Sequence, residues 1–371
     1  MNIIGYVKKY GNQTFKELPF NDIDALIFSE LSYLNFHLIG LKDSFRKINE
    51  LNIKNKKKFY ASSVDAFNNR RLFEAMIKSP RYQDMMVGKA QGKTNRRTNE
   101  QFYAVTLIFP NGVRFISYRG TDISVAGWKE DLLIAFQDEI PSQKSAIKYL
   151  RMILKEYDGK YYLGGHSKGG NLAMYSALKI GKRREKKIIK VFSFDGPGFK
   201  KNIYALESYK RIKHKLEKYL TTHDVIGVIY NKNPNPKIVY SNGVLLGGHD
   251  LFYWTIKKNK PEFVFDKERS KISRDGEYAL MSWLNSEDDE SKSLAVKVVC
   301  DILGDTKTIY DILLNAGRIL IKGIKTVGDY TEETKEKAKE IFKRLGKYYL
   351  HAYSPNRFLF SELSNKKKNH K

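Results

Sequence analysis

The sequence predicts an α/β fold in which a mostly parallel central sheet is flanked by helices. Three observations lead to this prediction. Strand-like and helix-like segments alternate from residue 113 to residue 221, the order that builds parallel sheets through helical crossovers. A glycine-rich turn joins one of these strands to the following helix at residues 164–170. After about residue 275 the strand-like segments stop and helical periodicity takes over.

The first hundred residues predict a helix followed by a weakly patterned segment. Residues 21–38 predict a helix, because apolar side chains recur at helical spacing and Asn21 or Asp22 can cap its start. Residues 41–100 are polar and basic and show no clear period. We interpret them as short helices and loops, a variable segment that is a candidate cover for the domain.

The alternating part begins near residue 101 and supplies the strands of the predicted sheet. Its first two strands are joined by the turn signal Pro110-Asn111-Gly112. The expected elements are strands at 104–109 and 113–118, a helix at 142–157, a strand at 161–164, a helix ending near Gly181, and strands at 188–194 and 215–221.

The change in pattern near residue 275 divides the chain. We expect an α/β domain over residues 1–270 and a helical C-terminal extension over residues 271–371. Several helices are predicted within 276–349, and residues 364–371 form a polar tail.

The chain is strongly basic, with 67 Lys and Arg against 41 Asp and Glu and a net charge of +26. The basic residues form scattered clusters without interleaved aromatic side chains, which makes a nucleic-acid partner unlikely. We therefore expect a solvated lysine-rich surface with a weak attraction to anionic membranes. The clusters are Lys56 to Lys58, Arg96 and Arg97, Lys182 to Lys187, Lys257 to Lys260, and Lys366 to Lys368.

Cysteine usage and apolar runs bound the class of protein further. Cys300 is the one cysteine, which excludes an intrachain disulfide and a cysteine-based metal cluster, and its valine-rich surroundings predict a buried thiol. The N-terminus has no signal-peptide pattern, and no apolar run reaches the roughly 18 residues of a membrane span. We expect a cytoplasmic protein, at most peripheral to the membrane. The sequence implies no metal and no organic cofactor.

The most specific motif is Gly165-His166-Ser167-Lys168-Gly169, which fits G-x-S-x-G between a strand and a helix. In this nucleophile elbow a strained turn projects the serine hydroxyl above the sheet, and glycines two residues away allow close passage of the backbone. Ser167 is therefore the predicted nucleophile. The Lys168 N–H, at the start of the helix, is a predicted oxyanion donor.

The order Ser, acid, His along the chain of α/β-hydrolases points to the remaining catalytic residues. His249 follows glycines downstream of Ser167, and we predict it as the base. Asp224 and Asp195 each follow a predicted strand between these two residues, so both are candidates for the acid. The histidines set aside are His37, His166, His214, His223, His351 and His370.

Three segments together resemble class 3 lipases, the fungal triglyceride lipase group. GGHSKGGNLA (164–173) resembles their elbow, ISYRGTD (116–122) a segment that ends a strand, and GWKEDL (127–132) their N-W-x-x-D-L segment. The order of the motifs also resembles a bacterial group of uncharacterised hydrolase-like proteins. The resemblance covers roughly residues 20–260.

This resemblance implies an α/β-hydrolase fold and assigns further roles. Thr121 takes the position that helps to form the oxyanion hole in those lipases. TTHDVIG (221–227) resembles the segment that carries their acid, which favours Asp224 over Asp195. The lipases also show a histidine followed shortly by Tyr-Trp, as His249 is by Tyr253 and Trp254.

Two residues near the oxyanion segment receive structural predictions. We expect Arg119 to pair with a carboxylate, for which Asp122, Glu130 and Asp131 are the candidates. We expect Trp128 to be a packing residue.

The predicted function is carboxylic ester hydrolysis by Ser167, His249 and Asp224, with Thr121 and Lys168 in the oxyanion hole. Small acyl esters, lipids, thioesters and acylated peptides are all open as substrates, as are a lid and the oligomeric state. The alternative is a catalytically silent protein of this fold that binds an anionic membrane or another partner through its basic surface. The apolar, lysine-containing segment 312–327 packs on the domain or lies on a membrane surface.

Overall fold

The computed structural model describes residues 1–63, 65–95, 97–122, 125–134, 137–200, 202–232, 235–243, 246–303 and 330–352. These residues fall into two compact units, one of Met1–Arg269 and one that begins at Ser270. The predictions for segment 312–327 and for tail 364–371 lie outside the described residues, and those for Trp128 and Cys300 outside the described side chains.

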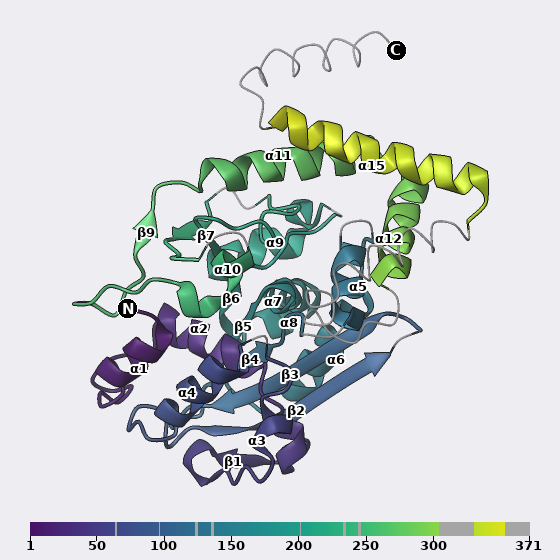
Figure 1. Cartoon of the computed structure of the whole chain (residues 1–371). Helices are drawn as coiled ribbons and strands as arrows, with labels where there is room; N and C mark the ends of the chain where they lie inside the picture. The colour runs from purple at the N-terminus through teal and green to yellow at the C-terminus, as the bar shows by residue number, and fades with distance from the viewer. Residues whose placement is uncertain are drawn as a thin grey trace. The chain divides into compact units, whose positions relative to one another are not determined.

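A nine-stranded mixed sheet forms the centre of the first unit, with its strands side by side in chain order (Figure 1). β1 to β4 are antiparallel neighbours, β4 to β8 run parallel, and β9 is antiparallel to β8. This arrangement confirms the predicted α/β fold. The strands are β1 (Phe45–Lys47), β2 (Met86–Asn95), β3 (Glu100–Ile108), β4 (Arg114–Tyr118), β5 (Tyr161–His166), β6 (Ile188–Phe194), β7 (Leu216–Thr221), β8 (Lys237–Val239) and β9 (Phe265–Asp266).

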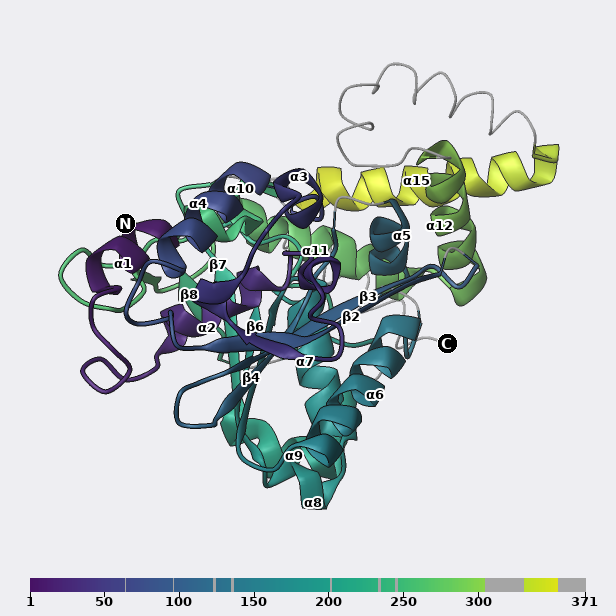
Figure 2. The ribbon, with the colours of Figure 1, turned by 90° about the horizontal axis from the view of Figure 1, so that it is seen from below.

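Helices cover both faces of this sheet, because side chains alternate along each strand. Phe192 of β6 joins a core with α1, α2 and α4, whereas its neighbour Val191 joins a second core with α6 and α7 (Figure 2). The helices are α1 (Ile3–Tyr10), α2 (Asp22–Leu31), α3 (Lys56–Phe59), α4 (Ala66–Met76), α5 (Val125–Ile134), α6 (Pro141–Glu156), α7 (Lys168–Lys179), α8 (Lys182–Glu185), α9 (Glu207–Ile212) and α10 (Leu246–His249), with short 3-10 turns η1 (Phe36–Ile39), η2 (Ile48–Glu50), η3 (Ile203–Ala205), η4 (Lys213–Lys215) and η5 (Leu251–Tyr253).

The parallel strands bring the predicted site residues to one edge of the sheet. Crossovers containing α6, α7 and α9 join β4 to β5, β5 to β6 and β6 to β7, so these four strands end at the same side. Thr121, Ser167, Asp195 and Asp224 each lie within a few residues of the end of one of these strands. Open α/β sheets bind their ligands at this carboxyl edge.

The helix predicted at residues 21–38, α2 in the structure, is shorter than expected. The Asn21 side chain caps α2 as expected, accepting hydrogen bonds from the second and third helical N–H groups, but the helix ends at Leu31. Beyond it the Arg119 guanidinium donates to the carbonyls of Ser32 at 2.6 Å and Leu34 at 3.1 Å. In a longer helix these carbonyl groups would accept hydrogen bonds from the helix backbone, whereas here they accept from Arg119. Sequence periodicity does not reveal such long-range bonds.

The segment 41–100 differs from its interpretation as short helices and loops. It contains α3 and α4, but also β1 and the ten-residue strand β2, which pairs along much of β3. The period-two signal of β2 is lost because the register with β3 shifts between Gly88 and Gln91. A Cβ on Gly88 would lie 1.9 Å from the Ser44 carbonyl oxygen, so this close approach of β1 requires a glycine.

The second unit is helical in its described part. It comprises α11 (Lys271–Ser286), α12 (Asp289–Leu303) and α15 (Glu332–Ala352). Arg344 of α15 donates to both carboxylate oxygens of buried Glu287 at 2.6 and 2.7 Å, which fixes α15 beside the end of α11. In the part of the chain that the structure describes, no helix is long and apolar enough to cross a membrane.

A buried ion pair anchors α2 in the first unit and yields a stability prediction. Arg81 donates from Nε at 2.9 Å to Asp24, and neither side chain is exposed. Arg81→Ala leaves the Asp24 charge buried without this partner, so we expect the free energy of unfolding in urea to fall by about 3–5 kcal/mol. Lys47→Ala is the matched control, because Lys47 pairs with Asp84 at 3.2 Å on the surface and its loss costs under about 1 kcal/mol. Equal losses in the two variants would contradict the prediction.

Candidate active site

Ser167 occupies a strained turn between β5 and α7. Its φ of 55° and ψ of −130° lie where L side chains are rarely found. Its N–H donates to the Phe194 carbonyl at 2.8 Å, and its carbonyl accepts from the Gly170 N–H at 2.9 Å. These bonds hold the turn at the carboxyl edge of the sheet. The result is the strand–turn–helix geometry that G-x-S-x-G predicts.

The glycines of the motif are required by close backbone contacts. A Cβ on Gly165 would lie 2.3 Å from the carbonyl carbon of Gly169. A Cβ on Gly169 would lie 2.1 Å from the Tyr118 carbonyl oxygen at the end of β4. Any larger residue at either position would push α7 away from the sheet, so the two glycines set where the turn sits.

His249, at the end of α10, faces two buried carboxyl groups. Its Nδ1 is 3.3 Å from Asp195 Oδ2 and 3.9 Å from Asp224 Oδ1. The structure therefore brings both candidate acids to the same ring nitrogen and places Asp195 nearer. Both Ser167 and His249 are described, and no hydrogen bond joins them. Such bonds often form only when a substrate is bound.

Backbone donors hold the two carboxyl groups in place. Asp195 accepts from the Thr221 N–H at 2.9 Å and from its hydroxyl at 3.3 Å, so it is fixed to the end of β7. Asp224 accepts from the N–H groups of Ile226 at 2.9 Å and Gly227 at 3.0 Å, as in an Asx turn. Neither side chain is exposed. Both acids are therefore fixed before any substrate arrives.

A buried lysine, which the sequence analysis missed, accompanies these acids. Lys218 of β7 is 3% exposed, and its ammonium donates to the carbonyl of Gly196, the residue after Asp195. Burial lowers the pKa of Lys218 to about 8, while the charges of Asp224 and Asp195 oppose this shift. Little in the sequence signals this lysine, because β7 reads LEKYLT and Lys218 stands beside Glu217 in a strand of mixed polarity.

Burial also changes the protonation of the acids and of the histidine. It raises the pKa of Asp195 to about 8 and that of Asp224 to about 7, and the charge of Asp195 raises the latter further. Burial lowers the pKa of His249, while Asp224, Asp131 and Asp250 oppose that shift. Near neutral pH the two carboxyl groups thus hold about one proton between them, and His249 is neutral.

His166, which the sequence analysis set aside as a candidate base, takes part in the site as a supporting residue. Its ring centroid is 4.4 Å from that of His249, its Nε2 is 2.9 Å from the His249 carbonyl, and its Nδ1 is 3.1 Å from the Tyr33 hydroxyl. A carbonyl can only accept, so Nε2 carries the proton and Tyr33 donates to Nδ1. Burial holds the pKa of His166 well below its usual value. His166 is a neutral support for the backbone of His249.

His166, Asp195 and His249 also place possible ligand atoms within 4.8 Å of one another, a spacing compatible with a metal ion. Both nitrogens of His166 are already engaged in hydrogen bonds. Metal binding through His166 would have to break one of them. The hydrogen bonds that His166 already makes therefore argue against a role for it as a metal ligand.

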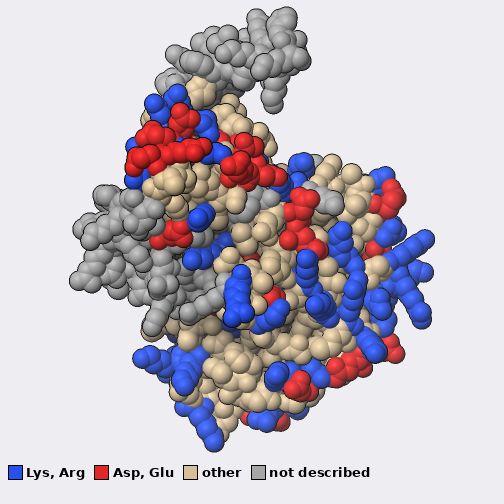
Figure 3. Space-filling view, turned by 90° about the vertical axis from the view of Figure 1, so that its right-hand side faces the viewer, with Lys and Arg blue, Asp and Glu red and all other residues tan. Residues whose placement is uncertain are grey.

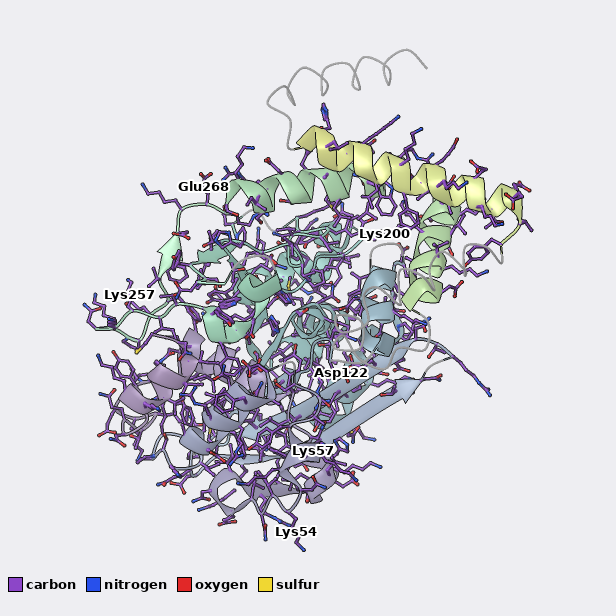
Figure 4. The ribbon with its side chains drawn as sticks, in the orientation of Figure 1. Lys54, Lys57, Asp122, Lys200, Lys257 and Glu268 are labelled. Carbon is purple, nitrogen blue, oxygen red and sulfur yellow. The ribbon has the colours of Figure 1, made fainter. Side chains whose placement is uncertain are left out.

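The loop after β4 packs directly against the serine. A Cβ on Gly120 would lie 3.2 Å from Ser167 Cβ and 2.5 Å from the His166 carbonyl oxygen. The next residue, Thr121, donates its hydroxyl proton to Asp131, and Asp122 follows (Figure 4). Because the hydroxyl proton of Thr121 is engaged, its backbone N–H is the group that can donate to an oxyanion.

Lys168 has two distinct roles in this arrangement. Its N–H opens α7 and has no acceptor within the helix. Its ammonium, fully buried, donates to Glu130 at 2.8 Å and to the Gln101 side-chain oxygen at 2.7 Å. This buried pair ties the first turn of α7 to α5 and to the start of β3. The sequence predicted the first role and gave no sign of the second.

The hydrogen bonds of Arg119 go to other groups than the carboxylates that we expected, although burial lowers the pKa of Arg119 and the charge of Asp122 opposes this effect. Its guanidinium donates to the two carbonyls that follow α2 and to the Asn35 side chain at 3.0 Å, and it lies 3.6 Å from the centre of the Tyr103 ring. Glu130 pairs instead with Lys168, and Asp131 accepts from Thr121. Arg119 is structural, but its role is to hold the end of α2 against the sheet.

The strained serine turn, the histidine beyond it and the buried acids at the carboxyl edge of a mixed sheet define the lipase-like class of α/β-hydrolase proteins. Within this class the chain belongs to the Mbeg1-like family, a lipase-like family of unknown function, whose model matches residues 76–301. No curated protein matches the chain by sequence.

Two solved structures of lipases are similar to the chain. The M37 lipase is 18% identical with a TM-score of 0.39, over 58% of this chain and 71% of that one. The Rhizomucor miehei lipase, in its native propeptide complex, is 15% identical with a TM-score of 0.36, over 59% of this chain and 68% of that one.

Proposed function

We propose that the protein is a serine hydrolase that cleaves carboxylic esters. The observation that carries the proposal is the position of Ser167. It lies on a strained turn at the start of α7, next to His166, which in turn packs against His249. Backbone strain of this kind costs free energy and persists where function requires it.

The proposed reaction has two steps. His249 Nδ1 faces the acids, so Nε2 is left to take the Ser167 proton as Oγ attacks the ester carbonyl carbon. The bond to the alcohol breaks, and the alcohol leaves with the proton from His249. Water then attacks the acyl-enzyme, with His249 as base again, and releases the acid. The N–H groups of Lys168 and Thr121 stabilise the oxyanion in both steps.

We further propose that His249 is oriented by the pair of acids, with the negative charge mostly on Asp224. Asp224 accepts two backbone hydrogen bonds at one oxygen, which stabilises its charge. Asp195 has the higher pKa of the two and is the nearer to the ring. In this arrangement Asp195 holds the shared proton, and Lys218 limits the charge that the buried pair must bear.

Fluorophosphonate labelling tests the proposal directly, because the reagent reacts with a serine only when that serine is activated. We expect one label per chain, at Ser167, identified by peptide mass spectrometry. Ser167→Ala should remove it, while Ser176→Ala, a second buried serine of α7, should keep it. A chain that stays unlabelled both in buffer and with detergent would contradict the proposal, and would favour a protein that acts by binding alone.

A further inference from the structure

Basic residues are unevenly distributed over the first unit. Figure 3 shows Lys and Arg in several separate groups over one face of the molecule. One stretch, residues 54–78, stands out because its only two acidic residues are Asp65 and Glu74. Its seven basic residues are Lys54, Lys56, Lys57, Lys58, Arg70, Arg71 and Lys78. All seven are exposed, and Lys54 and Lys57 are labelled in Figure 4.

Apolar side chains lie among these charges. Phe67, on the first turn of α4, is 69% exposed, and the Arg71 guanidinium lies 5.4 Å from the centre of its ring. Exposing a phenylalanine to water is unfavourable, and exposed apolar groups surrounded by cations are typical of surfaces that enter the headgroup region of a bilayer. Binding to the phosphates of a nucleic-acid duplex would explain the cations but not Phe67.

A cavity opens at this surface, and one of its lining residues is Asp250, which follows His249 in the chain. It has a volume of about 860 Å³ and lies between α3, α4 and the chain after α10. Tyr60, Ala61, Ala66 and Phe67 line its apolar part, and the acidic residues Asp65 and Asp250 also line it. Figure 2 shows α3, α4 and α10 along the same side of the sheet.

We propose that the α3–α4 surface, defined by residues 54–78, docks on an anionic phospholipid bilayer. Lys56, Lys57, Lys58 and Arg70 meet the lipid phosphates, and Phe67 enters the headgroup region. Glu74, which pairs with Arg70 at 2.8 Å and with Lys56 at 3.6 Å, offsets only part of this charge. Docking in this orientation places the cavity beside the bilayer, and we infer that an acyl chain enters it toward Asp250, the residue after His249. That last step rests on the proposed hydrolysis, whereas the docking does not.

Vesicle co-sedimentation of the full chain tests the docking. Phosphatidylcholine vesicles with and without about 30% phosphatidylglycerol are compared at low salt and at about 0.5 M NaCl. We expect binding to the anionic vesicles alone, weaker at high salt. Lys56→Gln/Lys57→Gln/Lys58→Gln should weaken it on the order of 100-fold, and Phe67→Ser about 10-fold. The matched control is Lys182→Gln/Arg183→Gln/Arg184→Gln, which removes three exposed charges from α8 and should leave affinity nearly unchanged.

Absence of binding to anionic vesicles at low salt would overturn the docking, and so would equal losses of affinity in the two triple variants. Tighter binding of the full chain to duplex DNA than to vesicles, lost in the α3 triple variant, would overturn it as well. Melting temperatures of the variants show whether each is folded. Ser167→Ala should dock as the unaltered chain does. An unaltered chain that docks but hydrolyses no ester would therefore refute the proposed hydrolysis alone, and an unaltered chain that hydrolyses esters but does not dock would refute the docking alone.

Discussion

Replacing Ser167 by alanine is expected to lower kcat/KM for a short-chain p-nitrophenyl ester by about 10⁴-fold or more, to the background rate. The serine oxygen forms the covalent acyl-enzyme, and alanine offers no atom in its place. The side chain is small and makes no hydrogen bond that holds the fold together. The turn keeps its strained backbone in the variant, so the melting temperature should change little.

The control for this prediction is Ser176→Ala. Ser176 also lies on α7 and is buried, and its hydroxyl is 3.2 Å from that of Tyr118, away from the turn. Its loss should cost some stability and leave kcat/KM within a few-fold of the starting value. Turnover that survives in Ser167→Ala but not in Ser176→Ala would exclude Ser167 as the nucleophile.

The parts of the fold that the sequence predicted are those with local signals. Strands β5 and β6 and helices α6 and α7 alternate at short intervals, and each has its own periodicity and turn residues. The G-x-S-x-G motif is local as well, since Gly165 and Gly169 are required by contacts within one strand–turn–helix unit and the adjoining β4.

The parts that could not be predicted depend on contacts between distant segments. Strand β2 is defined by its pairing with β3, and a register shift interrupts that pairing, so the sequence of β2 alone shows no alternation. Strands β8 and β9 are three and two residues long, too short for any period to be visible. The end of α2 is set by Arg119, which lies 87 residues away from Ser32.

The candidate site shows the same division. Ser167 and His249 follow from a motif and from the order of residues along the chain. The acid could not be reduced to one residue, because Asp195 and Asp224 follow neighbouring parallel strands and reach the same nitrogen. His166 and Lys218 were missed because a histidine next to the nucleophile and a lysine within a strand gain meaning only from their buried surroundings.

Replacing both Asp195 and Asp224 by asparagine is expected to lower kcat by about 10³–10⁴-fold, as in triads that lose their only acid. The imidazole then has no charge to hold its tautomer or to stabilise the imidazolium. Asp224→Asn alone should cost more than Asp195→Asn alone, because Asp224 bears most of the charge. If each single variant lost as much activity as the double variant, neither acid could partly replace the other, and the proposal that the two acids share the role would be wrong. If Asp195→Asn alone were inactive, Asp195 would be the acid.

The acidic side of the pH–rate profile distinguishes this pair from a single acid. Catalysis requires a neutral His249 and an ionised carboxylate. As pH rises, the ionised carboxylate is the second of these requirements to be met, because the pKa of Asp224 is raised to about 7 whereas that of His249 is lowered. We expect kcat/KM to climb through about pH 7. Asp195→Asn removes the smaller share of the negative charge, which Asp195 bears beside Asp224, so the pKa of Asp224 falls slightly and the rise should move slightly to lower pH. Lys218→Met removes a cation beside both acids, so their pKa values increase and the rise should move to higher pH.

These opposite shifts test the electrostatics apart from the fold. A variant that merely loosened the site would lower the plateau of the profile without moving its midpoint. Glu130→Gln serves as a control, because it removes a buried charge that pairs with Lys168 rather than with the acids. Asp131 and Asp250 also act on His249 and stay in place in every variant, so the direction of each shift can be attributed to Asp195 or Lys218. A midpoint that stays fixed in both variants would mean that neither residue sets the charge on Asp224.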